Sequence, residues 1–143
     1  MHGFAITIKK YSPMATGSDG MDMQSLMSES SRCADLLRCA YNLGEQELEL
    51  YRFLGGGQAM RSDDIAVSLG RNPSSIYRSL QKLLSCHMVN RRTVNMEGGG
   101  YYHLYSARGA QAVKKDLEAC VGEWKSRVDG LLEMFEKEME GSR

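Results

Sequence analysis

The run "DDIAVSLGRNPSSIYRSLQKLLSCHMVNRR", residues 63–92, decides the fold, because its turn and capping residues separate two helical patterns. Gly70 ends the first pattern, since glycine tolerates the left-handed backbone that often closes a helix. Asn72 is a good N-cap for the second, and Pro73 stands at the first helical position, where its missing N–H costs nothing. We therefore expect a helix over 63–69, a turn at 70–72 and a longer helix over 73–85. This order, with a short glycine-containing turn, is typical of a helix-turn-helix.

The second helix of this motif has two unlike sides. On a helical wheel its apolar residues cluster within about 100°, the width of a core-facing stripe; they are Ile76, Leu80, Leu83 and Leu84. Opposite them lie cationic and donor-rich residues, Ser74, Arg78, Gln81, Lys82 and Ser85, with Ser75 and Tyr77 on the flanks. Any solvated helix can carry such a face, but this one contains no acid.

The polar side of this helix suits the major groove of B-DNA, which admits one α-helix. Arg78 and Gln81 are the expected base contacts, because arginine reads guanine and glutamine reads adenine. Other polar residues are expected to position the DNA backbone: Arg71, Ser74, Ser75, Tyr77, Lys82, Arg91 and Arg92.

A two-stranded wing is predicted directly after the motif. Residues 88–96, "MVNRRTVNM", and 101–106, "YYHLYS", are rich in β-branched and aromatic residues, and "EGGG" at 97–100 forms the hairpin loop between them. The loop carries no Arg or Lys, so the DNA contacts of the wing are expected at its base, from Arg91 and Arg92. Neighbouring strand residues point to opposite faces, so one of the two is expected to contact DNA more strongly.

The charge distribution singles out the same region. The 143 residues carry 18 basic and 18 acidic side chains, so net charge alone gives no reason to expect nucleic-acid binding. From Gln58 to Gly109, however, seven basic residues face three acidic ones, a net charge of +4, and each flank has a net charge of −2. A basic middle between acidic flanks is the asymmetry expected of a DNA-binding domain, although chance can also produce +4 over such a length.

These motifs together resemble the winged helix-turn-helix transcriptional regulators of archaea, the TrmB-like proteins within the broader MarR-like group. The resemblance covers roughly residues 43–107. It rests on Ile65-Ala66…Leu69-Gly70, on Ser75-Ile76-Tyr77-Arg78, and on Leu80, Leu83 and Val89. It implies a mainly α, winged-helix fold (α+β) with a leading helix and a long C-terminal dimerisation helix. One departure is Cys86-His87 where the family has glycine, and we expect His87 to take the left-handed conformation there.

The flanks of the winged helix complete the expected domain plan. Residues 1–25 are rich in Ser, Pro, Gly and Asp and are expected to have little structure. Helical spacing then begins near Leu26 and runs to about residue 41, with a further helix over Glu45–Leu54 before the glycines at 55–57. The predicted winged-helix domain with its leading helix spans 26–107.

The last predicted segment, residues 108–143, is one long helix. Its apolar residues step by four and three, which is the seam of a coiled coil; they are Leu117, Val121, Trp124, Val128, Leu131 and Phe135. Such a stripe either packs on its own domain or pairs with a second copy. We favour a homodimer held by this helix.

Several other classes of site find little support in the sequence. There is no apolar run long enough to cross a membrane and no secretory signal, so a cytoplasmic protein without a membrane partner is expected. Cys33, Cys39, Cys86 and Cys120 lack metal-type spacing and are expected to be reduced, although a thiol switch remains open. No metal, cofactor or catalytic motif is predicted, and a small-molecule effector remains unknown.

The sequence thus predicts a homodimeric, sequence-specific regulator of transcription that binds double-stranded DNA. The rival interpretation is a winged helix that binds another protein and has no specific affinity for DNA. The basic helix face argues for the first, whereas the uncharged wing tip leaves the second open.

Overall fold

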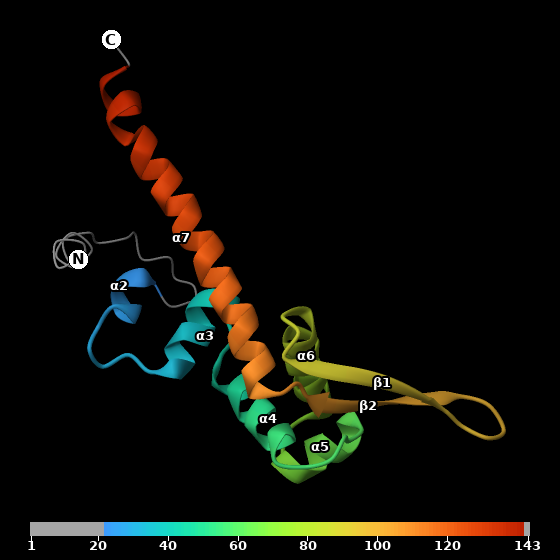
Figure 1. The fold of residues 1–143 in the computed structure, drawn as a ribbon. Coiled ribbons are helices and arrows are strands. Elements are labelled where there is room, and N and C mark those ends of the chain that lie inside the picture. Colours follow the sequence, from blue (N-terminus) through green and yellow to red (C-terminus); the bar gives the residue numbers. More distant parts are fainter. Residues whose placement is uncertain (1–21, 142–143) are drawn as a thin grey trace. The chain divides into compact units, whose positions relative to one another are not determined.

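The computed structural model describes residues 22–141, which divide after Gly109 into two compact units. The boundary between them lies two residues beyond the one expected from the sequence. In chain order, the first unit contains α2 (Met23–Leu26), α3 (Cys33–Tyr41), α4 (Glu45–Gly55), α5 (Ser62–Leu69), α6 (Pro73–Ser85), β1 (Val89–Asn95) and β2 (Tyr101–Ala107) (Figure 1). The second unit is α7 (Ala110–Glu140). The fold class is the predicted one, mainly helical with a two-stranded antiparallel wing.

The N-terminal expectations need correction. Most of the segment predicted to have little structure lies outside the described residues, but its end, Met23–Leu26, is a short helix. The continuous helix predicted from about Leu26 is also wrong, because the chain leaves the helical path at Met27 and starts a new helix only at Cys33. Serine hydroxyls explain the break: Ser28 Oγ accepts a hydrogen bond of 3.2 Å from the backbone N–H of Ser30. Such local bonds compete with helical ones.

The helix-turn-helix forms as its capping residues predict. Gly70 ends α5 with a left-handed φ of 64°, and the Asn72 side chain accepts the backbone N–H of Ser74 at the start of α6. The apolar sides of the two helices meet in a core where Ile65, Ile76 and Leu80 are fully buried. The helix α4 lies against α6 and β2, and contributes the buried Leu48, Leu50 and Leu54.

The wing follows α6 through His87, whose φ of 60° confirms the predicted left-handed conformation. β1 and β2 pair with Arg91 opposite Tyr105 and Arg92 opposite Leu104. Met60 adds an isolated bridge to Tyr105, which ties the segment before α5 to the edge of β2. In Figure 1 the hairpin extends away from α4, α5 and α6, and its loop is at the far end.

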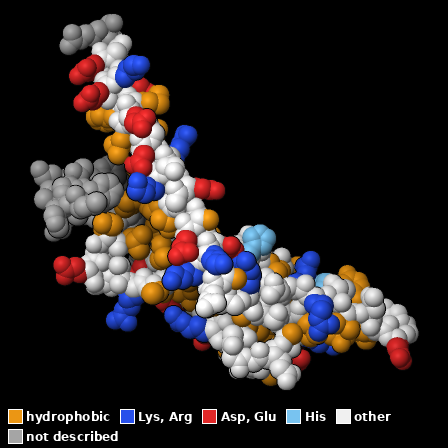
Figure 2. All heavy atoms as spheres, in the orientation of Figure 1, with side chains coloured by type: hydrophobic (Ala, Val, Ile, Leu, Met, Phe, Trp, Pro, Cys, Tyr) orange, Lys and Arg blue, Asp and Glu red, His pale blue; other side chains and the backbone are white. Residues whose placement is uncertain are grey.

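The second unit, α7, is a single helix of 31 residues. Four of the six predicted seam residues are exposed in the single chain: Val121, Trp124, Leu131 and Phe135. Leu117 and Val128 are half-buried. Figure 2 shows apolar side chains on the surface of α7, with acidic side chains beside them toward its C-terminal end.

Candidate nucleic-acid interface

The outward side of α6 presents the predicted cations to solvent. Arg78 and Lys82 are both exposed, one helical turn apart, and the ring of Tyr77 is 53% exposed beside them. The opposite side of the same helix is in the core, where Ile76, Leu80 and Leu83 have no exposed surface. The helix therefore has one anchored side and one cationic side that is free to meet a ligand.

The first turn of α6 is capped by its own side chains. Asn72 Oδ1 accepts a bond of 2.8 Å from the Ser74 backbone N–H and one of 2.6 Å from the Ser74 hydroxyl. The Ser74 hydroxyl hydrogen is thus already used, whereas its oxygen lone pairs remain exposed. Donation to a phosphate by the Ser74 side chain would require this bond to break.

Gln81 is placed differently from Arg78 and Lys82. It is half-buried, and its amide nitrogen is shielded from solvent without a hydrogen-bond partner among residues 22–141. An adenine contact by Gln81 remains a prediction, and it requires the side chain to rotate outward.

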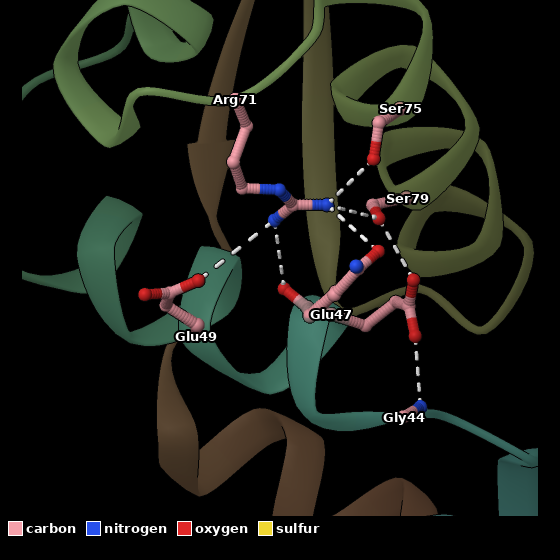
Figure 3. A network of polar contacts seen from close by, with 7 residues as sticks. Gly44, Glu47, Glu49, Arg71, Ser75 and Ser79 are labelled. Carbon is pink, nitrogen blue, oxygen red and sulfur yellow. Dashed lines mark hydrogen bonds and ion pairs between the residues drawn. The ribbon is translucent and has the colours of Figure 1, made fainter.

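Arg71, in the turn between α5 and α6, points into the domain (Figure 3). Its side chain is only 14% exposed, and its terminal nitrogens lie near oxygens of α4 and α6. Ser75 is half-buried and accepts one of these bonds, at 3.0 Å from Arg71 Nη2. These two predicted phosphate contacts remain untested, but both side chains already have partners within the domain.

The two wing arginines lie on opposite faces of the hairpin, because each shares a face with its cross-strand partner. Arg91 lies opposite Tyr105, which is 2% exposed. Burial raises the pKa of the Tyr105 hydroxyl, and the nearby Arg91 charge opposes that rise. Arg91 therefore shares a wing face with the buried Tyr105. Arg92, opposite Leu104, is on the other face.

Sequence reasoning missed the role of Arg61, the residue just before α5. Its guanidinium lies 4.3 Å from the centre of the Tyr102 ring on the wing, a cation–π contact. The one sequence signal for Arg61 was its place in the basic segment from Gln58 to Gly109. The wing is thus joined to the start of the helix-turn-helix through an exposed arginine.

The comparisons with known proteins agree with this geometry. The profile of the family described as "Sugar-specific transcriptional regulator TrmB" matches residues 37–110, just over half of the chain. The chain belongs to the TrmB family. Its curated relatives include the uncharacterized proteins MJ1503 and MJ1082 of Methanocaldococcus jannaschii. MJ1503 is 27% identical over 103 residues, which cover 72% of this chain and 78% of that protein. MJ1082 is 31% identical over 104 residues, which cover 71% of this chain and 83% of that protein.

Solved structures extend the comparison. A possible transcriptional regulator from Methanosarcina mazei Go1 superposes with a TM-score of 0.64 at 25% identity, covering 72% of this chain and 88% of that one. The ST1889 protein from Sulfolobus tokodaii shares the fold, with a TM-score of 0.52 at 19% identity, covering 66% of this chain and 93% of that one. The chain is therefore a winged-helix member of a family of DNA-binding transcriptional regulators, not of enzymes.

The wing tip of this TrmB-family protein has an unusual backbone. Gly98, Gly99 and Gly100 all have positive φ values, of 84°, 106° and 86°. Side chains at these positions would be strained, so the loop depends on glycine. The hairpin loop therefore presents backbone groups and the Glu97 side chain. The cations of the wing, Arg91 and Arg92, lie on the strand β1.

The described part of this TrmB-family chain lacks two kinds of feature. None of its helices over residues 22–141 is both long and apolar enough to cross a membrane. The same residues contain no group of three or more His, Cys, Asp or Glu side chains arranged to hold a metal ion.

Proposed function

We propose that this TrmB-family protein is a homodimeric regulator that binds a specific double-stranded DNA sequence through α6. The observation that carries the proposal is the two-sided geometry of α6. Ile76, Leu80 and Leu83 are fully buried in the core, while Arg78 and Lys82 of the same rigid helix are exposed to solvent. A helix held in this way presents its cations in a fixed position, and the major groove is wide enough to admit such a helix.

The proposed contacts divide into two kinds. Arg78 reads a base edge, and Gln81 does so after its side chain turns outward. Exposed polar groups hold the phosphates: Tyr77, Lys82, Arg91 and Arg92, joined by Ser74 once its hydroxyl releases Asn72. Phosphate contacts of this kind set orientation and overall affinity, whereas base contacts set sequence preference.

The proposed dimer forms through α7. At 1.5 Å per residue the helix is roughly 46 Å long, and its seam residues Val121, Trp124, Leu131 and Phe135 are between 38% and 55% exposed in one chain. An exposed apolar stripe of heptad spacing is typical of a helix that pairs with another. A second copy of the same helix offers a matching stripe, and the resulting two-fold symmetry gives two α6 helices for two DNA half-sites. This DNA partner agrees with the cytoplasmic location expected from the sequence.

The test is selection of bound duplexes from a random pool with the purified full chain, followed by mobility shift at several salt concentrations. The proposal predicts a two-fold symmetric sequence with half-sites about one helical turn apart, and an affinity that falls steeply with salt. Recovery of no preferred sequence, with weak binding to every duplex, would overturn it and favour the protein-binding alternative.

A further inference from the structure

A chain of polar contacts joins α4, the helix-turn-helix turn and α6 (Figure 3). We call it the α4–α6 network; its residues are Gly44, Gln46, Glu47, Glu49, Arg71, Ser75 and Ser79. Arg71 is its centre. Nη1 donates to the Gln46 backbone carbonyl at 3.3 Å and lies 3.9 Å from a carboxylate oxygen of Glu49. Nη2 lies 3.0 Å from Gln46 Oε1, 3.0 Å from Ser75 Oγ and 3.3 Å from Ser79 Oγ.

The network continues inward from Arg71 to a buried carboxylate. Ser79 Oγ accepts from Arg71 and donates to Glu47 Oε2 at 2.7 Å. The other carboxylate oxygen of Glu47 accepts the backbone N–H of Gly44 at 2.8 Å. A Cβ on Gly44 would lie 3.3 Å from that oxygen, so glycine gives the carboxylate room to approach. Glu47 and Ser79 are 6% and 2% exposed, and neither can meet DNA directly.

The buried carboxylate of Glu47 has cations close by. Burying a lone carboxylate is costly, but here the guanidinium of Arg71 is linked to it through one hydroxyl. Burial by itself would raise the pKa of Glu47, yet the bonds from Ser79 and Gly44 and the charge of Lys82 outweigh it, so the pKa lies below its usual value. The carboxylate is therefore charged at neutral pH and holds Ser79 firmly.

The position of these contacts on α6 gives them a function. Ser75 and Ser79 are one helical turn apart on the side that faces α4. Arg78 is exposed on the outward side, and Lys82 is exposed one turn further along, beside the first turn of α4. Because the helix is rigid, a fixed α4-facing side determines where the exposed side points. Without the network, mainly apolar contacts would hold α6 against the domain, and such contacts have no preferred direction. A small rotation of α6 would then misplace the base-reading side chains.

We propose that Arg71 is a positioning residue for DNA recognition, which sets the rotation of α6 through Ser75 and Ser79 and is not itself a phosphate contact. This inference rests on the proposed function, because it assigns how that binding surface is held. It differs from the expectation drawn from the sequence, in which Arg71 is one more cation facing the DNA backbone.

The two roles give different binding signatures. A phosphate contact strengthens binding to all sequences alike, and its loss lowers the salt slope of binding by about 0.9. A positioning residue strengthens only specific binding. We therefore expect Arg71→Met to weaken binding to the selected duplex roughly tenfold, the scale on which one misplaced base contact acts. Binding to a scrambled duplex of equal length, and its salt slope, should stay unchanged.

Ser79→Ala and Glu47→Gln give the decisive comparison, because both residues are buried and cannot contact DNA themselves. Each should lower the preference for the selected duplex over the scrambled one. Partial unfolding lowers both affinities by the same factor, so the preference is insensitive to a purely structural defect. Arg52→Met, an exposed residue of α4 outside the network, is the neutral control, and Lys82→Ala is the phosphate-contact control.

The outcomes separate the two proposals. If the wild-type protein prefers no duplex, the proposed function fails, and this inference fails with it. If the wild type is specific, but Arg71→Met weakens both duplexes equally and lowers the salt slope as Lys82→Ala does, only the positioning role is overturned. An unchanged preference in both Ser79→Ala and Glu47→Gln would overturn it as well.

Discussion

Ser79 donates a hydrogen bond of 2.7 Å to Glu47, joining the buried side of α6 to the first turn of α4 across 32 residues of sequence. Both residues are almost completely buried. A buried hydroxyl that donates to a buried carboxylate also specifies one geometry, since a rotated α6 would leave Glu47 Oε2 without this donor. The core around them is built from Leu and Ile side chains, whose packing depends on shape and, unlike a hydrogen bond, has no preferred direction. The polar pair therefore adds directional restraint to the helix that carries the candidate DNA contacts.

The first prediction concerns the pH dependence of stability. The pKa of Glu47 is lowered in the folded protein, so its contribution is present above the pKa of the unfolded chain and is lost as pH falls through the folded value. The free energy of unfolding should therefore decline as pH falls below about 4.3, the usual glutamate pKa. In Glu47→Gln this decline should be shallower, as measured by urea unfolding between pH 7 and pH 3. Glu97→Gln, in the exposed wing loop, is the control, and equal declines in wild type and Glu47→Gln would contradict the prediction.

A second prediction uses the backbone of His87. Its φ of 60° is a left-handed conformation that costs a side-chain-bearing residue energy but costs glycine little. The backbone N–H of His87 donates to the Leu84 carbonyl, and Arg108 Nη1 donates to the His87 carbonyl. We expect His87→Gly to raise the free energy of unfolding by about 0.5–1 kcal/mol. His87→Ala removes the same ring without relieving the backbone, so a gain of equal size in both variants would show that the ring, not φ, is responsible.

The parts of this fold that could be predicted from the sequence are those determined by neighbouring residues. Asn72, Pro73 and Gly70 act within one turn of the chain, and they fix the bounds of α6 and the end of α5. The exposed position of Arg78 and Lys82 follows from the period of one helix. The helix predicted from Leu26 was too long because apolar spacing alone does not register the serine hydroxyls that compete with it.

The parts that could not be predicted depend on contacts between distant segments. Arg71 lies in a turn, where no helical period says which way a side chain points, so its direction toward Gln46 was not visible. Ser79 is a small polar residue beside the apolar stripe, and its partner is on another helix. Arg61 required the hairpin to be placed before its contact with Tyr102 could be recognised.

A third prediction separates the two exposed cations of α6. Arg78→Ala should weaken binding to the selected duplex by roughly 1–3 kcal/mol and relax the sequence preference at one position, because a base contact is lost. Lys82→Ala should weaken binding to all duplexes alike and lower the salt slope by about one, because a phosphate contact is lost. Mobility-shift titrations at several salt concentrations, with selected and scrambled duplexes, measure both effects. Identical behaviour of the two variants would refute these assignments.

The last prediction concerns the proposed dimer. Leu131 and Phe135 are 54% and 55% exposed on α7, one turn apart on the seam. Pairing with a second copy would bury both, so a carboxylate placed there would have to be desolvated between two apolar helices. We expect Leu131→Glu and Phe135→Glu to shift the chain from dimer to monomer in sedimentation velocity, and to weaken DNA binding by loss of one half-site. Lys137→Gln makes the same change in net charge on the opposite side of the helix and should leave the dimer intact. A wild-type chain that sediments as a monomer at high concentration, or a seam variant that remains dimeric, would exclude α7 as the dimer interface.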